Sequence, residues 1–355
     1  MKKSIGWVLS LSLMLSSLLG ASPILKTKGP NGNSATSYKD ITISKDQEIQ
    51  IKKKNLKAAL LLHTSSDFTN SIKLGVEESF KKLGIDLVLT TDAGFDSNKQ
   101  RVDIETAMVL NPDIIITLIL DPVSGAVALK PAIEKGVKVV LISNLPKDFK
   151  HGKDYTSIVT DDLFGMGEAV AQMMNTQLNG KGNVALMYHD ANYYVTNQRD
   201  QAVKSVLTKE FPGIKIITSK GIANPSDAEA IAGAIITQNP NVDAIYAPWD
   251  SIAEGVVAAA RSASRRDIKI YTMDLGETNA LDMAKGRNVS GVIADLPYEL
   301  GSTVAKVGAL NTLNIKTPPF ITVPAIKISK DNLEEAWKES LKRDLPKSVK
   351  RALLK

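Results

Sequence analysis

Several residues in the second half of the chain have the side-chain types that bind a polyhydroxylated molecule. Carboxylate and amide groups share hydrogen bonds with hydroxyls, and a guanidinium supplies a planar fork of donors. A tryptophan face packs against the C–H face of a sugar ring. Each residue alone also has a bland explanation, such as helix capping by an Asp, but the recurrence of these types at predicted strand ends favours one shared site. The set comprises Asn197, Arg199, Trp249, Asp250 and Asp274.

Motifs of common catalytic and nucleotide-binding sites are missing from the sequence. There is no G-x-S-x-G, no H-E-x-x-H and no G-x-x-x-x-G-K-[ST]. The run from Gly165 begins like a dinucleotide fingerprint but has Val170 at the third glycine position, which predicts close helix packing instead. His63, His151 and His189 do not cluster, and the chain has no cysteine. We therefore expect no catalytic residue, no metal site and no cofactor.

The elements that must position these residues alternate regularly along the chain. Apolar runs without alternation predict strands that are buried on both faces of a parallel sheet. The predicted strands are 58–62, 85–89, 113–119, 137–142, 183–188, 214–218, 243–247, 268–273 and 289–293. Helical spacing is found at 70–83, 98–110, 163–178, 196–211, 226–238, 251–263, 277–286 and 297–312. This alternation predicts two doubly wound α/β units in tandem.

Ligand-binding groups in parallel sheets gather at the carboxyl ends of the strands. Two sheets whose loop ends face each other would place such residues around one cleft. The rule selects residues 64–68, Asp121, Asn144, Asp161 and Asp162, residues 189–194, Asn224, Trp249 and Asp250, Asp274 and Asp295.

Length and composition restrict the class of protein. A chain of 355 residues suits two domains, and 43% hydrophobic with 23% charged residues excludes disorder and a polytopic membrane protein. The net charge of +6 is concentrated in Lys2, Lys3 and a basic tail over 342–355, so it gives no argument for binding nucleic acid.

The first 21 residues have the pattern of a secretory signal peptide. Lys2 and Lys3 precede an uncharged run over 5–20, and small residues follow it. We expect cleavage after Ala21 and export to the periplasm or cell surface. Residues 22–54 predict a flexible arm, in which 41–51 has the alternation of a small hairpin. Residues 342–355 predict a short surface helix.

The chain resembles the type I periplasmic solute-binding proteins of ABC transporters, in their ribose- and galactose-binding branch. The resemblance extends over roughly residues 56–340 and depends on the order and spacing of several stretches. These stretches are residues 74–84, 158–165, 197–199, 242–250, 270–274 and 291–297.

The resemblance implies two Rossmann-like lobes with parallel sheets, joined by a three-strand hinge that closes over a sugar. The lobes would be residues 55–160 plus 296–323 and residues 161–295 plus 324–341. It also implies ligand contacts, of which Arg199 and Asp274 match the family types best. The full set of expected contacts is Asp67, Phe68, Asp121, Asn144, Asn197, Arg199, Asn224, Trp249, Asp250, Asp274 and Asp295.

These expectations describe a non-catalytic receptor that captures a small polar solute, first of all a sugar, and delivers it to a membrane ABC permease. The acid-rich site leaves a polyol or an amino-bearing solute open, and a sensing subunit for a receptor kinase or chemoreceptor is an alternative. A LacI-like regulator would need an N-terminal helix-turn-helix, which residues 1–54 do not offer. An enzyme is disfavoured because the adjacent acids Asp161 and Asp162 are expected to point apart.

Overall fold

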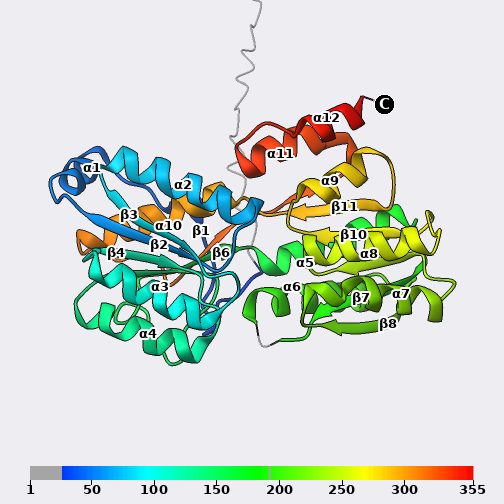
Figure 1. Cartoon of the computed structure of the whole chain (residues 1–355), viewed down its shortest axis with the longest axis horizontal. Helices are drawn as coiled ribbons and strands as arrows, with labels where there is room; N and C mark the ends of the chain where they lie inside the picture. Colours follow the sequence, from blue (N-terminus) through cyan, green and yellow to red (C-terminus); the bar gives the residue numbers. More distant parts are fainter. Residues whose placement is uncertain (1–25, 192, 355) are drawn as a thin grey trace, which may run out of the picture.

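The computed structural model describes residues 26–191 and 193–354, and the predicted signal peptide lies outside them. Two α/β lobes lie side by side (Figure 1). One contains a seven-stranded sheet of order β1-β12-β6-β5-β4-β2-β3, and the other a six-stranded sheet of order β13-β11-β10-β9-β7-β8. The two-lobed α/β fold predicted from the alternation of strands and helices is confirmed.

All strand pairs of the first lobe are parallel. Its helices cover both faces, with α1, α2 and α10 on one face and α3 and α4 on the other. Its strands are β1 (Thr36–Ser37), β2 (Lys57–Leu62), β3 (Asp86–Asp92), β4 (Ile114–Thr117), β5 (Lys138–Ile142), β6 (Ile158–Asp161) and β12 (Phe320–Val323). Its helices are α1 (Lys45–Lys52), α2 (Asp67–Leu83), α3 (Ser97–Val109), α4 (Pro122–Glu134) and α10 (Pro297–Thr312), with a 3-10 turn η1 (Tyr38–Asp40).

The second lobe has one antiparallel pair among its described strands, β11 with β13. Helices α5 and α6 cover one face, and α7, α8, α9, α11 and α12 the other. Its strands are β7 (Gly182–His189), β8 (Ile214–Ile222), β9 (Ala244–Ala247), β10 (Lys269–Met273), β11 (Val289–Ala294) and β13 (Ile326–Ile328). Its helices are α5 (Leu163–Gln177), α6 (Tyr194–Glu210), α7 (Ala228–Gln238), α8 (Asp250–Ser262), α9 (Glu277–Ala284), α11 (Leu333–Leu341) and α12 (Lys347–Leu353), with 3-10 turns η2 (Pro225–Asp227) and η3 (Lys330–Asn332).

Two glycines allow α2 and α10 to cross at very short range. A Cβ at Gly75 would lie 2.2 Å from the carbonyl oxygen of Tyr298, and one at Gly301 would lie 2.1 Å from that of Ile72. No real Cβ fits at such distances, so the two glycines permit this contact. The crossing packs α10, far along the chain, against α2 in the first lobe (Figure 1).

The chain passes between the two sheets three times. The passages follow β6 at Asp161, β11 at Asp295 and β12 at Pro324. Because the sheets meet at these three short segments, the residues beside them lie at the boundary between the lobes.

The segment before β2 differs from its prediction. The hairpin predicted over 41–51 is wrong, because residues 45–52 form helix α1, which begins with a capping box between Ser44 and Gln47. Ile41 and Ile51 are buried in the core of the first lobe, and β1 extends its sheet beside β12. In place of a flexible arm, residues 36–52 therefore form elements that pack on this lobe, because two isoleucines gain burial there.

Candidate functional site

A bidentate ion pair between Arg199 and Asp274 lies at the centre of the candidate site. Arg199 Nη1 donates to Asp274 Oδ1 at 2.7 Å and Nη2 to Oδ2 at 3.3 Å, and Nη2 also donates to the carbonyl of Pro248 at 3.1 Å. Arg199 comes from α6 and is 4% exposed, whereas Asp274 follows β10 in the left-handed region with φ 64°. Although burial opposes it, the Asp274 charge raises the pKa of Arg199 above its usual value. Arg199 and Asp274, both expected contacts from the sequence, are thus paired in the structure.

Two further acids are buried at the crossings between the lobes. Asp161 ends β6 and Asp295 follows β11, and both are at most 3% exposed. Burial and the Asp274 charge raise the pKa of Asp161 to about 7. Burial and the Asp161 charge raise the pKa of Asp295 well above its usual range. A carboxyl group that keeps its proton donates one hydrogen bond and accepts others. This pair of acids can therefore both donate hydrogen bonds to ligand hydroxyls and accept hydrogen bonds from them.

Tyr193 reaches from the second lobe to the first. It precedes α6, yet its ring packs against the core of the first lobe. Burial raises the pKa of Tyr193, and the side chain of Asn144, which follows β5, acts in the opposite direction, so the two groups are neighbours. Asn144 is buried and donates from Nδ2 to the carbonyl of Ile119 at 2.8 Å, while its Oδ1 has no partner among the described residues.

Aromatic rings flank the polar groups in both lobes. His63 lies 5.3 Å from Phe95 and 6.5 Å from Phe68 between ring centroids, in the first lobe. His189 lies 5.0 Å from Trp249 and 5.7 Å from Tyr193 in the second lobe. Burial lowers the pKa of His63 to about 4 and also lowers that of His189, so both rings are uncharged at neutral pH. Uncharged rings offer faces that suit the C–H surface of a sugar.

Asp250 and Asp67 extend the acidic character of the site. Asp250 begins α8, accepts from the backbone N–H of Ser251 at 2.7 Å, and has its pKa raised to about 7 by burial and by the Asp274 charge. Asp67 begins α2 and forms an ion pair with Arg343, which follows α11. The basic tail therefore supplies a partner for a predicted contact residue.

Three predicted contacts have local capping roles in the structure. Asp121 accepts from Ser124 N at 2.7 Å at the start of α4, and Asn224 accepts from Ser226 N at 3.1 Å in an exposed turn. Asn197 accepts from the backbone N–H of Tyr193 at 2.9 Å. No hydrogen bond within residues 26–191 and 193–354 joins these three side chains to Arg199 or Asp274.

A cavity of about 560 Å³ adjoins the site between β7, β8 and α6. It shares His189 and Asn197 with the candidate site. Its buried acid, Asp200, accepts from the backbone N–H of His189 at 2.8 Å and from the hydroxyl of Tyr246 at 2.7 Å. Asp200 thus has both oxygens occupied and holds the end of β7 in place.

Sequence reasoning left four residues out of the expected contacts. Asp161, His189 and Tyr193 occur among the strand-end residues selected by the topology rule, and that signal would have sufficed to include them. Arg343 had no local signal, because its contact with Asp67 depends on how the tail returns to α2.

The described part of the chain contains no group of three or more His, Cys, Asp or Glu side chains arranged to hold a metal ion. None of its helices is both long and apolar enough to cross a membrane. The candidate site consists of acids, amides, uncharged rings and the guanidinium of Arg199, with that of Arg343 paired to Asp67.

Such groups between two parallel α/β lobes define a two-lobed solute-binding protein. The chain belongs to the periplasmic binding protein domain family, which matches residues 58–311. The family and its relatives are binding proteins of transport systems rather than enzymes, and membership implies export. The resemblance seen in the sequence is confirmed.

Individual relatives are distant but extend over most of the chain. The ribose import binding protein RbsB of Bacillus subtilis is 26% identical over 306 residues, which are 85% of this chain and 90% of that protein. A xylitol-binding protein of Mycolicibacterium smegmatis is 26% identical over 280 residues, or 78% of this chain and 77% of that protein. A sugar-binding protein of a sugar ABC transporter from Bacillus halodurans has the same fold, with a TM-score of 0.72 at 20% identity, covering 79% of this chain and 99% of that one.

Proposed function

We propose that the protein captures a small sugar or polyol between its lobes by hinge closure and delivers it to a membrane ABC permease. The observation that carries the proposal is the buried Arg199–Asp274 pair, because its groups are pre-organised for vicinal hydroxyls. The names of the two relatives above, which bind ribose and xylitol, support this class of ligand.

Unpartnered polar atoms support the same class of ligand. Arg199 Nε, Asn144 Oδ1 and Asp161 Oδ1 are buried and have no partner among the described residues. A buried polar group without a partner costs about 1–3 kcal/mol. Ligand hydroxyls would supply hydrogen bonds to these atoms, which favours binding.

We infer the ligand contacts from the polar and aromatic groups that lie together at the site. We assign them to Asn144, Arg199, Trp249, Asp250, Asp274 and Asp295, with Asp161 and Tyr193 added from the structure. We also infer that the moving bodies are residues 55–160 plus 296–323 and residues 161–295 plus 324–341, with the three crossings as the hinge.

A thermal-shift screen against pentoses, hexoses and polyols tests the proposal, because a ligand that binds only the folded state raises the melting temperature by mass action. We expect at least one member to raise it, with one-to-one stoichiometry in calorimetry. A panel that leaves the melting temperature unchanged throughout would contradict a sugar or polyol as the ligand.

Export by a cleaved signal peptide is the second part of the proposal. We expect the mature protein from its native host to begin near Ser22 and to be found outside the cytoplasm. N-terminal sequencing decides, and intact Met1 in the cytosolic fraction would contradict it.

A further inference from the structure

The segment that precedes β1 contacts the second lobe. Lys26 Nζ lies 2.7 Å from Glu168 Oε1 on α5. The hydroxyl of Thr27 donates to the carboxylate of Asp162 and accepts from the backbone N–H of Phe164 at 3.0 Å. Thr27 is only 2% exposed, so this contact is sealed from solvent. Lys26 and Thr27 are therefore attached to the start of α5.

Lys28 also contacts the second lobe, and the next residue, Gly29, contacts the first. The carbonyl of Lys28 accepts from the hydroxyl of Tyr194, at the start of α6. Gly29 lies on β12, where a Cβ would come within 3.0 Å of the Phe320 ring. Because residues 28 and 29 contact different lobes, no slack chain separates the two attachments.

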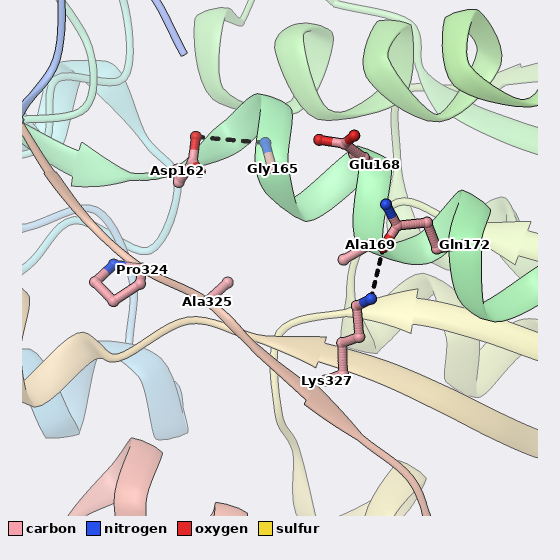
Figure 2. A pocket seen from close by; sticks show the side chains of 8 residues that line it. All are labelled: Asp162, Gly165, Glu168, Ala169, Gln172, Pro324, Ala325 and Lys327. Carbon is pink, nitrogen blue, oxygen red and sulfur yellow. Dashed lines mark hydrogen bonds between the residues drawn. The ribbon is translucent and has the colours of Figure 1, made fainter. Parts of the chain in front are cut away.

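The attachments lie at the hinge itself. Asp162 directly follows Asp161 at the first crossing and caps α5 by accepting from Gly165 N at 3.4 Å. Figure 2 shows this cap beside Pro324 and Ala325 of the third crossing, across a cavity of about 230 Å³. Further along, β1 pairs with β12 just before that crossing. Residues 26–37, the hinge strap, therefore contact segments that flank two of the three crossings.

We propose that the hinge strap restrains the opening of the two lobes, with Thr27 and Tyr194 as the positioning residues that attach it to the second lobe. The proposal rests on the hinge closure of the proposed function. Movement of the start of α6 away from β12 must break the Tyr194–Lys28 hydrogen bond or lift Gly29 from Phe320. The strap thus disfavours wide opening and keeps a larger fraction of the free protein close to the binding-competent arrangement.

A restraint on opening is expected to raise ligand affinity. The apparent dissociation constant equals the intrinsic one divided by the competent fraction of the free protein. Loss of the strap contacts lowers that fraction, so affinity falls although no ligand contact has changed. The ligand-bound state, held closed by its own contacts, keeps its dimensions.

The test uses isosteric loss of single hydroxyls in the full mature chain. Thr27→Val and Tyr194→Phe, alone and combined, are compared with Thr176→Val on the exposed side of α5 and Tyr188→Phe at an exposed position of β7. Lys26→Glu, which places a like charge beside Glu168 on the surface, is a further variant that leaves the buried contacts intact.

Small-angle scattering of the free proteins is the first readout and needs no sugar. We expect a larger radius of gyration for the double variant than for the parent, with both controls unchanged. Calorimetry with D-ribose and xylitol is the second readout. For whichever binds the parent, we expect affinity to fall about threefold or more in the double variant, with the scattering of the saturated protein unchanged.

The outcomes separate the strap from the proposed function. If neither sugar binds but the free double variant expands, the strap stands and the ligand class fails. If a sugar binds and closes the parent, but the double variant keeps the parent radius and affinity within about twofold, the strap proposal is wrong. If Thr27→Val unfolds, Tyr194→Phe and Lys26→Glu supply the same comparison.

Discussion

Arg199 combines burial, charge and a free donor in one side chain. Its fork holds both oxygens of Asp274, and its Nε faces no partner among the described residues. Lysine keeps the positive charge but loses the planar fork. The difference between the two side chains therefore isolates what the geometry of the guanidinium contributes.

We expect Arg199→Lys to weaken binding of the identified ligand by about 10–100-fold, because charge-assisted hydrogen bonds are lost in a closed site. Calorimetry measures it, with Arg101→Lys on the exposed side of α3 as the matched control. An affinity of Arg199→Lys within about twofold of the parent would contradict contact between Arg199 and the ligand.

Removal of the guanidinium also tests stability. Arg199→Ala leaves the partly buried Asp274 carboxylate without its partner, and breaking a buried ion pair costs about 3–5 kcal/mol. We expect a lower free energy of unfolding of that order in urea denaturation. Arg101→Ala, which breaks an exposed pair, is expected to cost at most about 1 kcal/mol, and equal costs for the two variants would contradict the burial argument.

The raised pKa of Asp161, about 7 against an ordinary 3.8, makes stability depend on pH. The folded state holds this proton more tightly than the unfolded state, so its contribution is full below about pH 4 and is lost as pH rises through about 7. Asp161→Asn mimics the protonated acid at every pH. We expect its free energy of unfolding to fall less between pH 5 and pH 8 than that of the parent, and parallel curves would count against a raised pKa.

The crossing of α2 and α10 depends on the absence of side chains. We expect Gly75→Ala to destabilise the protein by at least about 1–3 kcal/mol, because a Cβ has no room beside the carbonyl of Tyr298. Gly233 on α7 is the matched control, since nothing lies within 4 Å of its Cβ position. Gly233→Ala is expected to stabilise by about 0.5–1 kcal/mol. Thermal denaturation compares the two, and equal shifts would disprove the close crossing.

The central strands β2, β4, β5, β9, β10 and β11 were predictable because each is a short apolar run that is buried along most of its length, and the structure moves their bounds by only a few residues. Helix α1 was not, because its polar sequence has little helical periodicity and its stability depends on a capping box and on Ile51. Local patterns predict elements well where burial is uniform. They fail where a short element depends on distant surfaces.

The candidate site also contains residues that the sequence could predict and one that it could not. Asp274 and Asn144 follow predicted strands, so topology alone selected them. Arg343 reaches Asp67 only because α11 ends beside α2, where the hydroxyl of Ser71 donates to the carbonyl of Leu341 at 3.2 Å. No pattern along the sequence encodes that return, since the two segments are far apart in the chain.

At the scale of the whole molecule, ligand binding is expected to change shape. Saturating ligand should reduce the radius of gyration and alter tryptophan fluorescence, because Trp249 stacks edge-on against His189 at the site. Trp337 is fully buried in the second lobe and is expected to be silent. Trp249→Phe should abolish the fluorescence change without abolishing the scattering change. Saturation without any change in scattering would contradict hinge closure.

The position of β12 has a consequence for how the protein is made. This strand, residues 320–323, lies between β1 and β6, which are synthesised much earlier. The sheet of the first lobe therefore stays incomplete until nearly the whole chain has left the ribosome, whereas β7 to β11 are available as one continuous stretch.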